Sequence, residues 1–349
     1  MLSIPISFNA TQVHEMVSDN LLNSTALQFD APSLNISSLD EGIPRDDLDL
    51  SDIKLSMEEL IEKYGCISET HVVKTKDDYE LKLFRINKGE VSASKPPVFL
   101  QHGIFSSSAT WVLSKERSLA FKLAEAGYDV WTGNNRGDFY SRANTDLDPD
   151  SQGKLFFDYS FYELGEYDAP TQIDYVLEQT GKEKLSYIGH SQGTSQMFSA
   201  LSFNHGDMQD KLNVFIALAP IVQLKDSPNS MMQTASKIWH SLQWTAQVFH
   251  AYEVGNPTEL GAMRDFCSYF RPLCNSIHYW FSMCTPSSDY ERCLVDHGRQ
   301  SSGASLRELI HYAQIVSTGE FKLFDYGSDA GNIEKYGSAT VPHIPIEDI

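Results

Sequence analysis

One pentapeptide of the 349-residue sequence, Gly189-His190-Ser191-Gln192-Gly193, has the residue types and spacing of a nucleophilic serine. An apolar run precedes Ser191 and a helix-like run follows it, so we predict that the serine lies at the tip of a sharp strand-to-helix turn. The flanking glycines remove side chains that would clash in such a turn. A serine hydroxyl is a weak nucleophile, and it requires a histidine that accepts its proton and an acid that orients the histidine.

A second motif that bears on the same chemistry is LQHGIFSSSATW, at residues 100–111, directly after a predicted strand. His102-Gly103 begins a loop that can turn a backbone N–H toward an acyl oxygen, and the residue after the serine supplies another N–H. The backbone amides of Ile104 and Gln192 are therefore the candidate oxyanion donors. Together with Ser191, they predict acyl transfer through an acyl-enzyme.

The charge and hydropathy of the chain argue against two kinds of partner. The formal net charge is −20 at pH 7, whereas binding of nucleic acid phosphates needs a basic face. No apolar run approaches the roughly 20 residues that span a bilayer, so we expect no transmembrane segment.

The first residues lack a basic group before a short apolar patch, which is atypical of a signal peptide. Three sequons, at Asn9, Asn23 and Asn35, fit chance as well as glycosylation.

The cysteines leave two interpretations open. Cys66 stands alone, and four others cluster at Cys267, Cys274, Cys284 and Cys293. Their spacing lacks the close Cys-x-x-Cys pairs of a zinc site, so no metal is expected. Disulfides within the cluster are expected if the protein is lumenal, and reduced thiols packed in a helical region are the alternative.

The pattern along the chain predicts an α/β fold. Residues 1–54 are polar, acidic and aperiodic, and we interpret them as a flexible leader. Residues 55–220 alternate strand-like and helix-like segments, as in a mostly parallel sheet covered on both faces. They begin with a helix capped by Ser56 and Glu59 and a hairpin through Asp77-Asp78. Strands are then predicted at 98–101, 128–132, 185–188 and 214–219, and helices near 118–126, 162–180 and 192–203.

The alternation stops after Pro220. Residues 213–222, NVFIALAPIV, are predicted to form a buried strand, and residues 221–320 are then aromatic and irregularly helical. We interpret 221–320 as a helical cap insertion whose apolar inner face also binds an apolar substrate. Residues 321–349 are expected to return to the core.

These segments together resemble the acid lipase family of α/β-hydrolases, the group that contains lysosomal acid lipase, gastric lipase and related steryl ester hydrolases. The resemblance is carried in family order by LIEKYG, LQHGIFSSSATW, YDVWTGNNRGDFYSR, FDYSFYELGEYDAPTQIDYVL, YIGHSQGT, LAP and FDYGS. It implies hydrolysis of long-chain fatty acid esters, triacylglycerols or steryl esters, at a lipid–water interface and without a metal or organic cofactor. Ser191 matches the family's nucleophile, and Ile104 and Gln192 match its oxyanion positions.

The resemblance also implies a secreted or lysosomal location. The weak signal sequence leaves a cytoplasmic or lipid-droplet location as the alternative. The chain departs from the family at Asp138-Phe139 and Asn144, where Asn-Thr and His are usual, and we expect structural roles for these residues.

A larger departure concerns the partners of Ser191. In the family the acid and the histidine lie beyond the equivalent of KYGSATVPHIPIEDI, with which this sequence ends. The triad Asp and His, together with the last core strands, are therefore expected to lie outside it. Asp325 or Asp329 with His343 is the internal alternative.

The other histidines, His102, His190, His297 and His311, are expected to be structural. On this expectation, the chain by itself hydrolyses esters weakly or not at all. Two alternatives to a hydrolase stay open: a truncated or inactive form that binds lipid through the cap, and an acyltransferase on the same scaffold.

Overall fold

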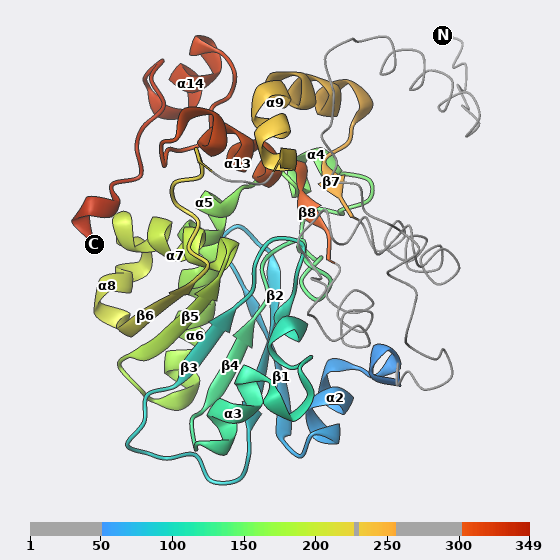
Figure 1. The fold of residues 1–349 in the computed structure, drawn as a ribbon, viewed down its shortest axis with the longest axis vertical. Coiled ribbons are helices and arrows are strands. Elements are labelled where there is room, and N and C mark those ends of the chain that lie inside the picture. Colours follow the sequence, from blue (N-terminus) through green and yellow to red (C-terminus); the bar gives the residue numbers. More distant parts are fainter. Residues whose placement is uncertain (1–50, 227–229, 256–301) are drawn as a thin grey trace. The chain divides into compact units, whose positions relative to one another are not determined.

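The computed structural model describes residues 51–226, 230–255 and 302–349, and its centre is a six-stranded sheet of order β1-β2-β4-β3-β5-β6 (Figure 1). Strands β4, β3, β5 and β6 run parallel, and the antiparallel hairpin β1-β2 joins them at β4. The mostly parallel sheet that the sequence predicts is therefore confirmed. The strands are β1 Ile67–Lys74, β2 Glu80–Asn87, β3 Val98–Gln101, β4 Val130–Gly133, β5 Leu185–His190 and β6 Leu212–Leu218.

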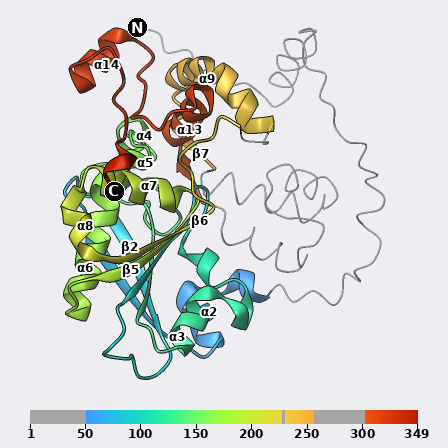
Figure 2. The same ribbon diagram turned by 60° about the vertical axis from the view of Figure 1, so that its left-hand side comes forward.

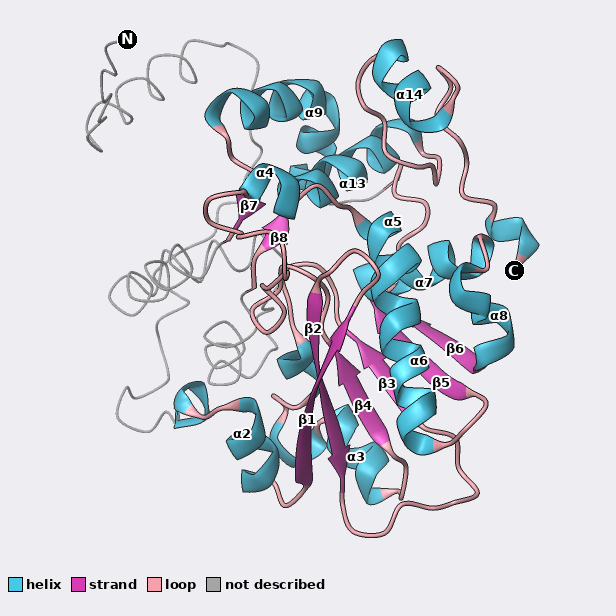
Figure 3. Cartoon of the chain, turned by 180° about the vertical axis from the view of Figure 1, so that it is seen from behind, coloured by secondary structure: helices cyan, strands magenta, loops and turns pink. Residues whose placement is uncertain are grey.

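Helices cover both faces of this sheet (Figure 3). Side chains alternate along β3, so Val98 and Leu100 face α2 and α3, whereas Phe99 packs with Trp131 and Tyr187 against α6 and α7. The main helices are α2 Met57–Lys63, α3 Leu119–Glu125, α6 Ala169–Thr180 and α7 Gln192–Ser202. Shorter helical turns are Ser51–Lys54, Ser108–Trp111, Lys115–Arg117, α4 Gly153–Phe156, α5 Phe161–Glu163, Leu164–Asp168, His205–Asp207, α8 Met208–Lys211 and Ile346–Asp348.

The start of the described chain is fixed to α2. The turn Ser51–Lys54 buries Asp52, whose carboxylate accepts from Lys63 Nζ at 2.7 Å and from the Tyr64 hydroxyl at 2.9 Å. Ser56 forms the capping box that the sequence predicts. Residues 51–54, predicted from the sequence to be part of the flexible leader, thus pack against α2 and belong to the folded domain.

The cap lies over the carboxyl ends of the parallel strands (Figure 2). It contains α9 Ser230–Phe249, α13 Leu306–Thr318 and the strand pair β7 Glu253–Val254 and β8 Ala304–Ser305. Helix α14 Asp329–Tyr336 lies beside the cap helices, although residues 321–349 are expected from the sequence to return to the core. Trp239 of α9 packs with Ile310 and Ala313 of α13. No helix in the described segments is long and apolar enough to cross a membrane. The three sequons and the four clustered cysteines lie outside the described residues, and Cys66 is buried.

Strand β6 differs from the buried strand that the sequence predicts. Val214 and Ile216 are each 42% exposed and Leu218 is 38% exposed. The reason is that, within the described residues, β6 pairs with β5 alone and is an edge strand. The apolar run therefore predicted the strand correctly, but it did not predict how many strands pair with it.

We expect the chain to self-associate through β6 at rising concentration, because a strand edge beside exposed apolar side chains is a template for pairing. The double substitution Val214→Thr/Ile216→Thr should lower the weight-average mass in sedimentation or light scattering and leave the circular dichroism spectrum unchanged. Val72→Thr is the control, since Val72 is 55% exposed on β1 at the opposite edge. Equal association of the double variant and the parent chain would contradict this prediction.

Candidate active site

Ser191 occupies a strained turn between β5 and α7. Its backbone has φ 52° and ψ −117°. Such a conformation costs a non-glycine residue about 1–3 kcal/mol. The Ser191 N–H donates to the carbonyl of Leu218 at 3.0 Å, and the Ser191 carbonyl accepts from the Thr194 N–H at 2.8 Å. The sharp strand-to-helix turn that the sequence predicts is therefore present, with a half-buried serine at the carboxyl end of β5.

The two glycines of the pentapeptide are required by close packing. A Cβ on Gly193 would lie 2.7 Å from the carbonyl oxygen of Gln101 and 2.8 Å from that of His102. A Cβ on Gly189 would lie 2.6 Å from the carbonyl oxygen of Gly193. Since all these neighbours are backbone atoms, none can move aside cheaply. The first turn of α7 thus rests directly on the end of β3.

The loop after β3 passes beside the serine. A Cβ on Gly103 would lie 3.0 Å from the Cβ of Ser191, so the backbone at this point is in contact with the candidate nucleophile. Ile104 follows directly in the chain, and Gln192 is the first residue of α7, where backbone N–H groups have no partner within the helix. The structure therefore brings Ser191, the loop of Ile104 and the Gln192 amide together.

His102 and Asp138 form a buried pair at the base of this loop. Nδ1 of His102 lies 2.8 Å from the carbonyl oxygen of Gly103, and Nε2 lies 3.0 Å from Oδ2 of Asp138. Both side chains are 3% exposed. Burial raises the pKa of the Asp138 carboxyl, and His102 opposes that rise. Asp138, for which the sequence suggested only a structural role, thus helps to fix the loop of Ile104.

Hydrogen bonds between buried amide side chains join the strand, loop and helix around Ser191. Gln101 Nε2 donates to Asn135 Oδ1 at 3.0 Å, and Asn135 Nδ2 donates to Gln196 Oε1 at 2.9 Å. These bonds join β3, the loop after β4 and α7. Asn135 and Gln196 both donate and accept, so neither amide can turn without breaking these bonds, whereas Oε1 of Gln101 has no hydrogen-bond partner among the described residues.

The loop after β4 is anchored by Arg136, whose side chain is only 2% exposed. Its Nε donates to Asp168 Oδ1 at 2.7 Å and its backbone N–H to Asp168 Oδ2 at 2.8 Å, while Asp77 pairs with the other side of the guanidinium. Burial raises the pKa of Asp168 to about 6 even though Arg136 acts to lower it. The loop that carries Asn135 and Asp138 is therefore held by a compensated buried charge.

Gln192 makes a further contact that the sequence did not reveal. Its side-chain Nε2 donates to Oε1 of Glu308, a residue of α13 that is 3% exposed. Oε2 of Glu308 accepts from the Ser305 N–H at 2.8 Å, which completes a capping box at the start of α13. The Ser-x-x-Glu pattern of that box is visible in the sequence. The contact with Gln192, far away in the chain, is not.

Two family models match this chain: one describes a partial alpha/beta-hydrolase lipase region, at residues 57–115, and the other the alpha/beta hydrolase fold, at residues 96–264. Lipase member K of Homo sapiens is 33% identical over 298 residues, which are 82% of this chain and 73% of that protein. Gastric triacylglycerol lipase of Rattus norvegicus is 34% identical over 304 residues, 84% of this chain and 75% of that protein. The chain belongs to the acid lipase family of α/β-hydrolases. By family it is an ester hydrolase.

A solved structure of epoxide hydrolase A from Mycobacterium thermoresistibile resembles this acid lipase family member with a TM-score of 0.31 and 19% sequence identity. The match covers 49% of this chain and 45% of that one. So low a score carries no argument about function.

Within the described residues of this acid lipase family member, no histidine hydrogen-bonds to the Ser191 hydroxyl. His343 is 60% exposed and lies 3.8 Å from Glu320, so the internal alternative of Asp325 or Asp329 with His343 gains no support. His311 is buried, and its Nε2 donates to the Lys322 carbonyl at 2.8 Å. Burial lowers the pKa of His311 to about 3. His297 lies outside the described residues.

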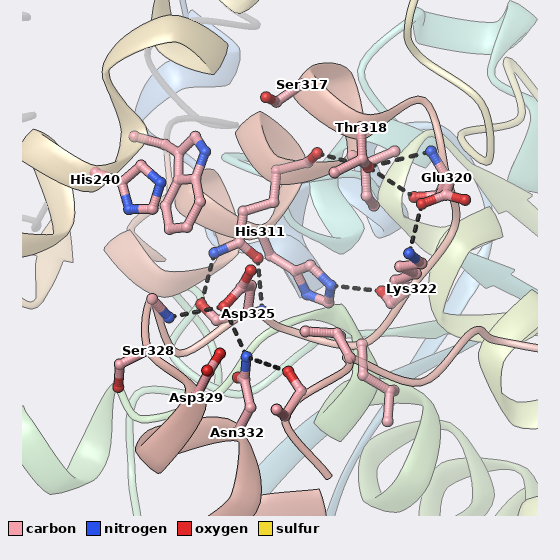
Figure 4. A pocket seen from close by; sticks show the side chains of 17 residues that line it. His240, His311, Ser317, Thr318, Glu320, Lys322, Asp325, Ser328, Asp329 and Asn332 are labelled. Carbon is pink, nitrogen blue, oxygen red and sulfur yellow. Dashed lines mark hydrogen bonds and ion pairs between the residues drawn. The ribbon is translucent and has the colours of Figure 1, made fainter.

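A cavity of about 460 Å³ lies in the cap of this acid lipase family member, between α13, α14 and the segment 320–341 (Figure 4). His311, Asp325 and Asn332 are among its lining residues, and neither Ser191 nor Gln192 is. It is therefore separate from the nucleophile. The described part of the chain contains no group of three or more His, Cys, Asp or Glu side chains that could hold a metal ion.

We expect Gly193→Ala to destabilise the protein, because the new methyl group would meet two backbone carbonyls at under 3 Å. Overpacking of this kind costs about 1–3 kcal/mol of unfolding free energy. Gly153→Ala is the matched control, since its Cβ would meet its nearest neighbours at 3.8 Å. Urea denaturation of the two variants checks the prediction, and equal midpoints would contradict it.

Proposed function

We propose that this chain hydrolyses carboxylic esters of long-chain fatty acids, triacylglycerols among them, with Ser191 as the nucleophile. The observation that carries the proposal is the strained Ser191 turn in contact with the loop of Gly103 and Ile104, beside the free N–H end of α7. A strained, non-glycine turn of this kind persists only where the surrounding structure enforces it, and such turns cluster at active sites. Membership of a lipase family supports the same chemistry.

The proposed reaction proceeds in two steps. Ser191 Oγ attacks the ester carbonyl carbon as its proton passes to a histidine, and the carbonyl oxygen becomes an oxyanion that accepts from the Ile104 and Gln192 N–H groups. The C–O bond to the alcohol breaks, and the alcohol leaves with the proton from the histidine. Water then attacks the acyl-enzyme in the same way and releases the fatty acid and Ser191.

The general base and its orienting acid are proposed to lie outside the described residues. This proposal rests on the positions of the described histidines, since His102 is paired with Asp138 and His311 is paired with the Lys322 carbonyl. In this proposal the described residues provide the nucleophile, the oxyanion donors and part of the cap.

The acyl chain is proposed to bind under the cap. Ile104 lies at the edge of an apolar cluster that contains Phe161, Leu224 and Tyr312, so the oxyanion loop and the cap helix α13 share one apolar surface. Each CH₂ group buried on such a surface contributes about 0.8 kcal/mol, which favours long acyl chains. The gastric lipases among the relatives support triacylglycerol as substrate and a secreted or lysosomal location; steryl esters are a further proposed substrate on the family resemblance alone.

We expect all ester hydrolysis by this chain to depend on Ser191, because loss of the nucleophile of a serine hydrolase costs about 10⁶ in turnover. Hydrolysis of a nitrophenyl ester and labelling by a fluorophosphonate probe should disappear in Ser191→Ala. Ser199→Ala on the same helix is the matched control, since its buried hydroxyl has no hydrogen-bond partner among the described residues.

The same assay should be run on the chain fused to the C-terminal segment of rat gastric lipase, which would supply an acid and a histidine. We expect the fusion to hydrolyse long-chain esters faster than the chain alone, and only when Ser191 is present. A fusion that melts cooperatively but neither hydrolyses esters nor labels at Ser191 would overturn the proposed function.

A further inference from the structure

Glu308 is a buried carboxyl group beside the proposed oxyanion site. It lies near the start of α13 and is 3% exposed. One of its oxygens accepts from the Ser305 N–H at 2.8 Å, and the other accepts from the Gln192 side chain. The second contact joins the cap to the residue whose backbone N–H is a proposed oxyanion donor.

The charged groups around Glu308 do not neutralise it. Asp168 and Glu163 are the acidic neighbours that act on it, and the charge of Glu308 in turn raises the pKa values of Tyr159 and Tyr312. The nearby cations are already paired: Arg136 with Asp168 and Asp77, and Arg307 with Asp158 and Glu163.

Burial without a counter-charge favours the neutral acid. It raises the pKa of Glu308 to about 8, and the hydrogen bonds from Ser305 and Gln192 only partly oppose the rise. Because the pKa of Glu308 is higher in the folded state, its protonation stabilises the fold. This stabilisation is fully present below the unfolded pKa of about 4.3, and it is lost as the pH rises through about 8.

We propose that Glu308 is a positioning residue that acts through Gln192: the neutral acid holds the oxyanion residue in place, and ionisation of Glu308 slows the reaction. This inference rests on the proposed function of Ser191. It adds that the cap helix α13 contributes to the oxyanion site and that the reaction is limited to the pH range in which Glu308 keeps its proton.

Both protonation states can contact Gln192, but in opposite directions. The carboxylate accepts from the amide nitrogen, whereas the neutral acid donates its O–H to the amide oxygen after the amide turns by 180°, a turn that exchanges two nearly identical shapes. The ionised form also places an unpaired negative charge beside the site where negative charge develops in the transition state. In a buried site of low polarity, that repulsion opposes formation of the oxyanion.

The test takes the fusion to the C-terminal segment of rat gastric lipase as the parent, and compares the pH dependence of its Ser191-dependent ester hydrolysis with that of the same fusion carrying Glu308→Gln or Glu308→Ala. The kcat of the parent should fall as the pH rises through about 8. Glu308→Gln keeps the shape and both contacts without titrating, so the fall should be absent. Glu308→Ala should lower kcat about 10- to 100-fold below pH 7, with KM nearly unchanged, because the oxyanion donor is misplaced. The same fall in the parent and in Glu308→Gln would overturn the inference.

Glu59 provides a matched control for the capping role of Glu308. It caps α2 in the same way, through a 2.7 Å bond from the Ser56 N–H, but α2 lies away from the Ser191 turn at the start of α7 (Figure 1). Glu59→Gln should leave the pH profile of hydrolysis as in the parent. A change equal to that of Glu308→Gln would show that loss of any capping carboxylate suffices, and would overturn the inference.

Two measurements that do not require catalysis, an infrared spectrum and a melting temperature, separate this inference from the proposed function. The infrared band of a protonated carboxylic acid should be present in the parent at pH 6 and absent from Glu308→Gln, and Glu308→Gln should gain melting temperature over the parent as the pH rises from 5 to 9. If no Ser191-dependent reaction is found, the proposed function fails, and these measurements alone decide whether Glu308 is neutral. If the band is absent, or if both melting curves shift equally with pH, the inference fails whatever the activity.

Discussion

The carbonyl oxygens at the end of β3 lie so close to the first turn of α7 that no side chain fits between them. A Cβ on Gly193 would be 2.7 Å from the Gln101 oxygen and 2.8 Å from the His102 oxygen. This contact sets how closely α7 lies against β3, and the chain passes from β5 into α7 through Ser191, which has a φ of 52°. It also places the loop of Gly103 against the serine. The proposed nucleophile and the proposed oxyanion loop are thus arranged by one backbone contact.

The loops around this contact contain buried charges, and the three cases differ in how the charge is compensated. Arg136 is matched by two carboxylates, a fixed arrangement with directional bonds on both sides. His102 Nε2 faces Asp138 Oδ2 at 3.0 Å and accepts from the Asn135 N–H at 3.2 Å, so the Asp138 carboxyl has a polar neighbour but no full counter-charge. Glu308 has no cation, so its burial disfavours the charged state instead. The Arg136 cluster holds its loop while Asp77 and Asp168 are ionised, whereas the contact of Glu308 with Gln192 depends on whether Glu308 itself carries a proton.

Local patterns in the sequence predicted local structure well, because a capping box, a hairpin turn and a Gly-x-Ser-x-Gly turn are each determined within a few residues. Ser56, the Asp77-Asp78 hairpin and the Ser191 turn are examples. Properties set by distant neighbours were not predicted. The exposure of Ile216 depends on how many strands flank β6, and the contact between Glu308 and Gln192 joins residues 116 positions apart. Periodicity reports which residues are apolar, not which element covers them.

Helix α13 is where these long-range contacts meet. Its first turn carries Glu308, which contacts Gln192. Its middle carries His311 and Tyr312, whose rings stack on Phe161 at centroid distances of 4.2 and 5.3 Å. Another face of the helix packs on Trp239 of α9. Because packed interiors deform little, α13 cannot shift with the cap without separating Glu308 from Gln192 or breaking the aromatic stack. A substrate that changes the packing of the cap would therefore act on the proposed oxyanion site through α13 and its contact between Glu308 and Gln192.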